Sequence, residues 1–209
     1  MSGFDLQRQR MVEDQLIRRG IRDPRILKAF STVPRHLFVP EEVRDKSYAD
    51  RPLPIGGGQT ISQPYIQALM MQELDLKPEA KVFEIGTGSG YETALLCELV
   101  SSVFSIERIQ ELADAASKVL AGLGYADVHL RCADGTLGWP EEAPFDGILA
   151  AAAASEIPQA FLEQLCEGGR LVIPIGSSVE QTLTVIRRSD GAFEKKDLCS
   201  CMFVPLIGA

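Results

Sequence analysis

The sequence predicts an α/β fold built on a mostly parallel, seven-stranded sheet with helices on both faces. From residue 81 onward, short apolar runs alternate with amphipathic stretches, as strands and crossover helices do in parallel sheets. The first apolar run, 81–85, leads directly into the glycine-rich turn Gly86–Gly90, and a helical pattern follows. A strand, a tight glycine turn and a helix in this order are typical of nucleotide-binding α/β domains.

The residues before the sheet form an N-terminal extension of helices and loops. We expect helices at 5–19, from Asp23-Pro24 to residue 33, and at 64–74; an acid followed by proline is a helix start. The Pro- and Gly-rich stretch 35–64 is expected to be irregular, and its length indicates a functional loop. Because 209 residues suit one domain, we predict a single domain with this extension over 1–78 and an α/β core over 79–209.

Seven strands and three helices are predicted within the core. The expected strands are 81–85, 103–107, 128–132, 145–151, 170–175, 182–188 and 198–205. The expected helices are 90–100, 108–121 and 158–166. The last two strands are separated only by the turn residues Ser189-Asp190-Gly191, so this end of the sheet should be antiparallel.

The glycine turn and the acid at the end of the second strand together predict a nucleoside-bearing cofactor. Glycines allow close backbone approach to a ligand, and Glu107 is placed to accept hydrogen bonds from ribose hydroxyls. Tyr91 stands where the dinucleotide fingerprint has its third glycine, which disfavours an NAD-dependent oxidoreductase. The G-x-G-x-G pattern instead resembles the first motif of S-adenosylmethionine-dependent methyltransferases. A ligand-free tight turn is the alternative.

Composition excludes several other classes of protein. The net charge of −8 argues against nucleic acid as a partner, because phosphate binding needs clustered Lys and Arg. No apolar run approaches the ~20 residues that span a bilayer. The first ten residues are polar and lack the apolar segment of a secretion signal, so we expect a cytoplasmic protein.

Cysteine and histidine give no sign of a metal or hydrolase site. The chain has five cysteines, an odd number, and we interpret them as reduced core residues. Its two histidines, His36 and His129, have no cysteine or carboxylate at ligand spacing. We therefore predict no metal site and no Ser-His-Asp hydrolase.

Several sequence blocks resemble the protein-L-isoaspartate (D-aspartate) O-methyltransferase family. Most specific is PLPIGGGQTISQP at residues 52–64; generic methyltransferases share only the glycine turn. The other blocks are MVEDQL at 11–16, VPRHLFVP at 33–40, GWP at 138–140, APFD at 143–146, GGRLVIP at 168–174 and FVPL at 203–206. They extend over nearly the whole chain.

The resemblance implies a Rossmann-like methyltransferase fold and a protein-repair activity. Members of this family methylate the free carboxylate of L-isoaspartyl and D-aspartyl residues in damaged proteins and peptides, using S-adenosyl-L-methionine and releasing S-adenosyl-L-homocysteine. The ester then closes to a succinimide that can reopen to normal aspartate. We expect a monomer. The alternatives are a same-fold methyltransferase acting on a different carboxylate or small-molecule acceptor, and a protein that binds cofactor without turnover.

Methyl transfer to a carboxylate requires the enzyme to align the two reactants more than to move a proton. A carboxylate with a pKa near ~3.5–4 is already ionised at neutral pH, so no general base is required. From the pattern alone, Ser62 fits either a helix N-cap or a hydroxyl that orients the carboxylate. The resemblance places the catalytic serine there and implies that substrate binds at Thr60, Ile61, Ser62 and Val204.

The expected cofactor contacts follow the carboxyl ends of the strands. The residues expected at the methionine and ribose part are Glu84, Gly86, Gly88 and Gly90, with Glu107 on the ribose hydroxyls. Asp134 and Gly135, after the third strand, are where similar enzymes contact the adenine amino group. Asp134 alternatively caps a turn.

Three positions depart from the family pattern. Ala133-Asp134-Gly135 replaces the common Gly-Asp-Gly but keeps the acid. Ser155 stands in place of a proline after the fourth strand, and Met202 in place of an arginine before the final motif. The last two lie near the expected substrate side, so we expect them to raise KM for peptides. For Met202, the alternative is a core-facing strand residue.

Overall fold

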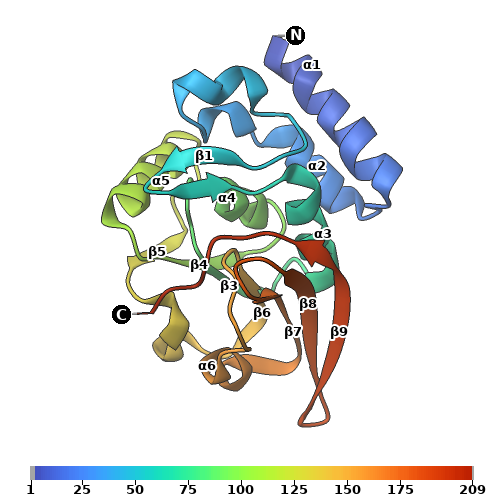
Figure 1. Ribbon diagram of the computed structural model, residues 1–209, viewed down its shortest axis with the longest axis vertical. Coiled ribbons are helices and arrows are strands. Elements are labelled where there is room, and N and C mark those ends of the chain that lie inside the picture. The colour runs from blue at the N-terminus through green and yellow to red at the C-terminus, as the bar shows by residue number, and fades with distance from the viewer. Residues whose placement is uncertain (1–2, 209) are drawn as a thin grey trace.

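A twisted seven-stranded sheet forms the centre of the computed structural model, which describes residues 3–208 (Figure 1). The strands are β3 Lys81–Ile85, β4 Ser102–Glu107, β5 His129–Cys132, β6 Phe145–Ala150, β7 Leu165–Gly176, β8 Gln181–Ser189 and β9 Ala192–Cys201. They lie in the order β5-β4-β3-β6-β7-β8-β9. The strands from β5 to β7 are parallel, whereas β8 and β9 pair antiparallel. The predicted fold class and its antiparallel end are confirmed.

The strand order reverses between β3 and β6. From β3 the chain proceeds outward through β4 to β5, then returns to β6 on the other side of β3 and continues to β7. In open α/β sheets such a switch leaves a crevice beyond the carboxyl ends of the two strands. The glycine turn after β3 and the alanine run after β6 therefore meet at one place.

Both faces of the sheet are covered because side chains alternate along each strand. Val82, Val103 and Leu149 belong to the core cluster on one face, and Phe83 and Phe104 to the cluster on the other. The core helices are α4 Tyr91–Cys97, α5 Gln110–Gly122 and α6 Gln159–Glu163, with short 3₁₀ turns at η5 Gly135–Leu137 and η6 Pro140–Glu142. Figure 1 shows α6 on the opposite side of the strands from α3 and α4.

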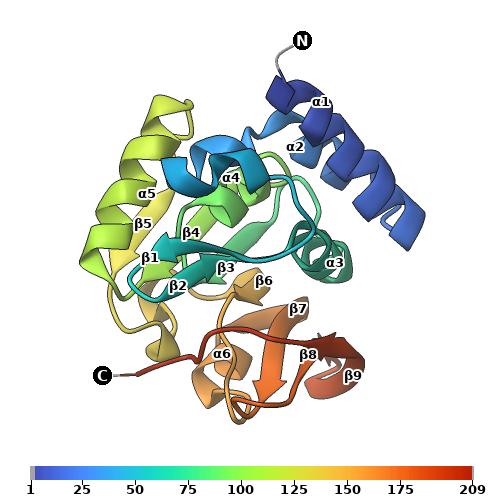
Figure 2. The same cartoon turned by 45° about the horizontal axis from the view of Figure 1, so that its top comes forward.

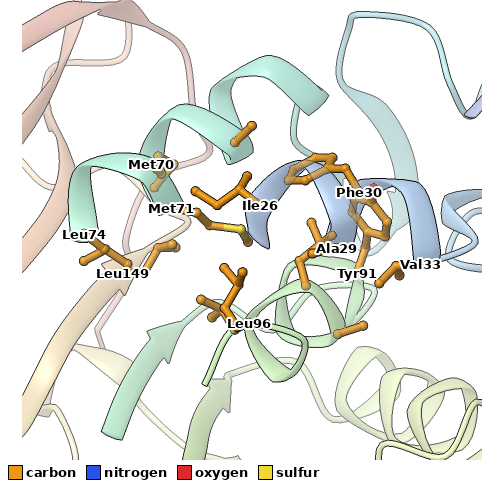
Figure 3. Packing of buried hydrophobic residues seen from close by; sticks show 14 of the residues in the cluster. Ile26, Ala29, Phe30, Val33, Met70, Met71, Leu74, Tyr91, Leu96 and Leu149 are labelled. Carbon is orange, nitrogen blue, oxygen red and sulfur yellow. The ribbon is translucent and has the colours of Figure 1, made fainter. Parts of the chain in front are cut away.

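The N-terminal extension packs on the face that α4 covers. Its helices are α1 Gly3–Arg10, the π-helical η1 Met11–Leu16, the 3₁₀ turn η2 Ile17–Arg19, α2 Pro24–Thr32, the 3₁₀ turns η3 Arg35–Leu37 and η4 Glu41–Lys46, and α3 Pro64–Leu74. Asp23 accepts a hydrogen bond from Arg25 N and caps α2, as the sequence predicted. Figure 3 shows how Phe30 of α2, Met71 of α3, and Tyr91 and Leu96 of α4 meet in one buried cluster. The extension and the sheet thus share one hydrophobic core.

The stretch expected to be irregular contains a β-hairpin. Strands β1 Leu53–Gly56 and β2 Gln59–Ile61 pair antiparallel. Gly56, Gly57 and Gly58 all take positive φ, which an L side chain rarely adopts, so the glycine run allows this tight turn. Our expectation of no regular structure at 35–64 is wrong over the hairpin, although the rest of the stretch forms only short 3₁₀ turns and loops.

Other boundaries also differ from the predictions. The first helix changes to π and 3₁₀ geometry after Arg10, and α6 ends at Glu163 because Leu165 already begins β7. Strand β9 is Ala192–Cys201, not 198–205, so the final motif follows the strand. All five cysteines are free, but Cys132 is exposed, which contradicts a core position for it. Within residues 3–208, no helix has the length and apolar character required to cross a membrane.

Candidate active site

A cavity of about 720 Å³ lies beyond the carboxyl ends of β3, β4 and β6. Its floor consists of the residues that follow these strands, including the glycine turn and Ala151-Ala152. The end of the β1–β2 hairpin and the C-terminal tail, residues 204–207, line it from above. Figure 2 shows this tail leaving β9 and returning across the sheet beneath the hairpin. The lining combines apolar side chains with a few polar groups, as small-molecule sites do.

The glycine turn places backbone against the cavity. Gly86 and Gly88 line it and take φ values of 97° and 55°. A Cβ on Gly86 would contact Ala151 at 3.5 Å, and a Cβ on Gly88 would approach Ile55 of the hairpin to 3.3 Å. The turn therefore leaves free space for a ligand only because it lacks side chains.

Glu107, at the end of β4, is fixed by backbone N–H groups. Its Oε2 accepts a hydrogen bond from Gly88 N at 2.9 Å, and its Oε1 accepts one from Ile109 N at 2.9 Å. The side chain lines the cavity although it is only 6 % exposed. Each carboxylate oxygen has lone pairs left, so this carboxylate can also accept hydrogen bonds from a diol.

Two residues expected at the cofactor lie behind the cavity wall. Glu84 is fully buried, and its Oε2 accepts hydrogen bonds from Thr93 Oγ1 at 2.6 Å and Ser105 Oγ at 2.5 Å. A Cβ on Gly90 would lie 3.2 Å from Ala116 and Leu120, so this glycine allows α4 and α5 to pack closely. Neither residue lines the cavity, and direct contact of either with a cofactor stays a prediction.

The acid after β5 has a local structural role. Asp134 Oδ1 accepts hydrogen bonds from Thr136 N and Oγ1 and caps η5, which is the alternative that the sequence left open. Gly135 lines the cavity, where a Cβ would come within 2.7 Å of Ile85. Contact of Asp134 with an adenine amino group stays a prediction.

Ser62 lies where two cavities meet. Thr60 and Ser62 line both the large cavity and a second one of about 600 Å³, which Met202 and Phe203 also line. The N-cap residue of α3 is Gln63, without a side-chain cap hydrogen bond, so the structure does not support the cap alternative for Ser62. Ile61 is buried and lines only the large cavity.

Arg35, a residue that the sequence did not single out, holds Ser62 in place. It is fully buried and donates to Ser62 O at 2.7 Å, Ser47 O at 2.7 Å and Gln67 Oε1 at 2.9 Å. Its guanidinium lies over the Tyr91 ring, 4.7 Å from the centroid. Burial lowers the pKa of Arg35, but an arginine guanidinium keeps its proton in proteins. A buried cation thus fixes the backbone of the candidate catalytic residue.

A second polar side chain holds the C-terminal tail. Gln181 on β8 accepts a hydrogen bond from Phe203 N at 2.6 Å and donates to Phe203 O at 3.1 Å. Ala153 N donates to Val204 O at 2.8 Å. These bonds bring Val204 to both cavities.

Two further buried residues on the cavity wall were missed by the sequence reasoning. Gln67 is 2 % exposed, and Glu92, in the first turn of α4, is 4 % exposed. Burial, together with the negative charge of Glu84, raises the pKa of Glu92 well above its usual value. No local pattern marks such residues, because a polar residue on a buried helix face resembles an ordinary surface residue in sequence.

Among the described residues, neither histidine lines this cavity. His36 stacks on Phe4 with centroids 4.2 Å apart and shares a hydrogen bond with the Tyr48 hydroxyl, whereas His129 stacks on Phe104. Within residues 3–208, no cluster of His, Cys, Asp and Glu could hold a metal ion.

The two departures on the expected substrate side have different environments. Met202 is 62 % exposed and lines the second cavity, so the core-facing alternative for it is wrong. Ser155 is exposed and lines neither of these two cavities.

Comparison with known proteins assigns the family. The profile of the protein-L-isoaspartate (D-aspartate) O-methyltransferase family matches residues 7–209. The chain belongs to this family. It is 52 % identical over 208 residues to protein-L-isoaspartate O-methyltransferase 1 of Syntrophobacter fumaroxidans, with 100 % of this chain and 97 % of the relative covered. The enzyme of Syntrophus aciditrophicus is 55 % identical over 211 residues, with the same coverage. The resemblance noted in the sequence is confirmed.

Solved structures agree with this assignment. One protein-L-isoaspartate O-methyltransferase superimposes with a TM-score of 0.87 at 29 % identity, covering 96 % of this chain and 66 % of that one. A Plasmodium falciparum structure assigned to the same enzyme, in complex with S-adenosyl-L-homocysteine, gives a TM-score of 0.84 at 27 % identity and covers 99 % of both chains. This family member therefore has the Rossmann-like S-adenosylmethionine-dependent methyltransferase fold.

Proposed function

We propose that this family member transfers a methyl group from S-adenosyl-L-methionine to the free carboxylate of L-isoaspartyl and D-aspartyl residues in damaged proteins and peptides. The observation that carries the proposal is the position of Ser62, which lines both the cavity behind the glycine turn and the second cavity beside Met202. A methyl donor in the first cavity and a peptide acceptor in the second would meet at this residue.

The large cavity fits the cofactor chemically. Gly86 and Gly135 line the cavity with backbone alone, and the Glu107 carboxylate can accept hydrogen bonds from two ribose hydroxyls. When bound, S-adenosyl-L-methionine supplies an electrophilic methyl group on a sulfonium. We assign Gly86, Gly88, Glu107 and Gly135 to its binding, with Glu84, Gly90 and Asp134 supporting the turns around it.

Ser62 orients the acceptor. Its hydroxyl can donate to one oxygen of the isoaspartyl carboxylate and direct the other oxygen toward the methyl group. Thr60 and Val204 border both cavities and would hold the peptide, and Ile61 would do so from the first cavity. Alignment of two reactants contributes roughly 7–11 kcal/mol of barrier reduction, so this positioning can account for much of the rate.

The role of the site in this reaction would be to exclude water from the reactants, with no proton transfer by a side chain. The hairpin and the C-terminal tail lie over the cavity, so they would exclude water from the reacting carboxylate. An isoaspartyl carboxylate is ionised at neutral pH, so the distance of both histidines from the cavity suits a reaction without a general base.

A peptide pair tests the proposal. The protein is incubated with methyl-labelled S-adenosyl-L-methionine and either an isoaspartyl peptide or the same peptide with normal aspartate. We expect base-labile label only in the isoaspartyl peptide. Label in neither peptide, with S-adenosyl-L-homocysteine still bound, would refute protein repair and favour a different carboxylate or small-molecule acceptor.

We also propose a location, a class of partner and an oligomeric state for the enzyme. A cytoplasmic location is supported by the five free thiols, which suit a reducing compartment. The net charge of −8 supports a role without nucleic acid as partner. We propose a monomer of one domain, with N-terminal helices and a substrate-side loop over 1–78 and the cofactor-binding α/β core over 79–209; sedimentation at several protein concentrations tests the oligomeric state.

A further inference from the structure

Glu92 is a buried carboxylate on the wall of the cofactor cavity, with one oxygen that lacks a partner. Its side chain begins in the first turn of α4, is 4 % exposed, and lines the cavity together with Gln67 and Thr87. Oε1 is buried and makes no hydrogen bond among the described residues. An unpaired, buried carboxylate oxygen is costly, so a cationic ligand group would satisfy it.

The neighbours of Glu92 do not neutralise this acid fully. Glu84 on β3 adds a second negative charge, whereas Arg35 of η3 and the Gln67 amide on α3 favour the ionised form. Arg35 directs its guanidinium hydrogen bonds to Gln67 and to two backbone carbonyls, and none to Glu92. The cavity wall therefore contains an acid without a dedicated internal counter-charge.

The residues around Glu92 indicate which part of the cofactor lies next to it. Glu107 lies at the end of β4, accepts a hydrogen bond from Gly88 N, and is assigned to the ribose. Ser62 marks the place of the acceptor, and Gln67 lies in the first turn of α3, next to Glu92. Glu92 thus faces the amino-acid part of the cofactor, which carries an α-ammonium and a sulfonium.

Chemistry decides between these two cations. The acceptor in this reaction is itself a carboxylate, so a carboxylate in contact with the sulfonium methyl would compete for that methyl group and form a glutamyl ester. The α-ammonium carries no transferable methyl group and offers several N–H donors, which suit an unpaired carboxylate oxygen.

We propose that Glu92 binds the α-ammonium group of the methionine moiety of the cofactor. This inference rests on the proposed function, because it takes S-adenosyl-L-methionine as the ligand of the cavity. It also has a pH consequence. Burial and the negative charge of Glu84 raise the pKa of Glu92 well above its usual value in the free protein. A bound cation favours the ionised form, so binding should release protons and strengthen as pH rises.

Calorimetry with three ligands tests the assignment on the variant Glu92→Gln. S-Adenosyl-L-methionine and S-adenosyl-L-homocysteine both carry the ammonium, only the first carries the sulfonium, and 5′-methylthioadenosine lacks the whole amino-acid part. We expect Glu92→Gln to weaken the first two by about tenfold to a hundredfold each, as for a lost hydrogen bond to a charged group, and to leave the third unchanged. Glu111→Gln, which removes one exposed negative charge from α5, is the control and should bind all three as the wild type does.

Proton release gives a second readout. Titration in buffers of different ionisation enthalpy, between pH 6 and 8, should show release with S-adenosyl-L-homocysteine for the wild type and for Glu111→Gln but not for Glu92→Gln. Thermal unfolding of each variant confirms that it is folded.

The outcomes separate this inference from the proposed function. A wild type that binds none of the three ligands would refute the cofactor assignment itself. Intact wild-type binding with no change in Glu92→Gln would refute only the role of Glu92. Weakening of S-adenosyl-L-methionine alone would indicate the sulfonium, and equal weakening of 5′-methylthioadenosine would indicate a distorted turn; either result overturns the ammonium assignment.

Discussion

The two sides of the active site are held together in different ways. On the cofactor side, most of the hydrogen bonds that fix the site involve backbone groups. The Glu107 carboxylate accepts hydrogen bonds from two backbone amides, and Gly86 N donates to Ile106 O. On the substrate side, long buried side chains hold pieces of loop: Arg35 binds the Ser62 carbonyl, and Gln181 binds both backbone groups of Phe203. The first arrangement follows from a short local motif, whereas the second joins residues distant in sequence.

This difference affects how each side responds to mutation. A strand-turn-helix unit is part of the sheet and remains ordered while the sheet is folded. The hairpin, the start of α3 and the C-terminal tail lie outside the sheet, so their positions depend on a few polar contacts. We therefore expect single changes at Arg35 to affect both fold and catalysis, and single changes on the cofactor side to affect chiefly affinity.

The largest effect is expected for Arg35→Met. The change leaves two backbone carbonyls and Gln67 Oε1 without their donor in a fully buried place. We expect unfolding free energy to fall by about 2–4 kcal/mol. We also expect kcat/KM for an isoaspartyl peptide to fall more than affinity for S-adenosyl-L-homocysteine.

The control for Arg35 is Arg51→Met, at an exposed arginine in the same loop region. Denaturant unfolding and peptide kinetics on both variants measure the effect. If the two variants behave alike, the clamp on Ser62 contributes nothing beyond ordinary surface charge.

Ser62→Ala separates catalysis from folding. The hydroxyl caps no helix, so we expect stability within ~0.5 kcal/mol of the wild type, as for surface changes. Loss of an oriented donor should reduce kcat/KM by roughly tenfold to a thousandfold, with cofactor affinity retained. Ser155→Ala, at an exposed serine outside both cavities, is the matched control. A destabilised Ser62→Ala that keeps its activity per folded molecule would mean a purely structural serine.

On the cofactor side, the buried carboxyl group of Glu84 should make the stability of the fold depend on pH. Burial raises the pKa of Glu84 to about 7. The folded state therefore binds more protons than the unfolded state between the unfolded pKa near ~4.5 and about 7, so stability should fall as pH rises through this window. The upper bound is on the order of 3 kcal/mol. Denaturant unfolding from pH 4.5 to 8 should show this decline, and Glu84→Gln should reduce it; a wild type whose stability rises over the same range contradicts the argument.

Glu107→Ala tests the cofactor side for affinity. It removes the proposed partner of the ribose hydroxyls and the acceptor of Gly88 N and Ile109 N. We expect binding of S-adenosyl-L-homocysteine to weaken by about 1–3 kcal/mol, with a smaller loss in Glu107→Gln, which retains an acceptor. Calorimetry provides the measurement, and unchanged affinity would remove Glu107 from the site.

The same contrast explains what the sequence could predict. The parallel strands, the glycine turn and the place of Glu107 all depend on patterns within a few residues, and the structure has them where predicted. The hairpin β1–β2 was missed because its glycines and prolines are typical of an irregular loop. The boundary of β9 was misplaced because this edge strand is largely exposed and its sequence, AFEKKDLCSC, lacks apolar alternation.

The contacts that hold the substrate side together cannot be recognised from short sequence patterns. Arg35 resembles a surface arginine in the sequence, and only the fold buries it against Gln67 of α3 and Tyr91 of α4. Gln181 begins a strand that pairs on both sides. Gly90, in contrast, was recognised from the sequence; the structure adds that it allows α4 to pack closely on α5, and its contact with the cofactor stays a prediction. These roles depend on contacts between residues that are distant in the sequence, and a single sequence does not show such contacts.

The smallest expected effect, and the most specific test of the substrate side, is Met202→Arg. The side chain is 62 % exposed and borders the second cavity, so arginine there keeps its charge in water and should leave the melting temperature nearly unchanged. A positive charge beside an anionic acceptor should lower KM for isoaspartyl peptides by about two- to fivefold, as for an exposed charge pair of about 0.5–1 kcal/mol, with kcat retained. Ser155→Pro restores the other family residue but lies outside both cavities, so it should leave KM unchanged. Because the charge is exposed, the gain at Met202 should shrink in 0.5 M salt. A gain from Ser155→Pro without one from Met202→Arg would show that stiffness of the loop after β6, and not charge beside the second cavity, limits peptide binding.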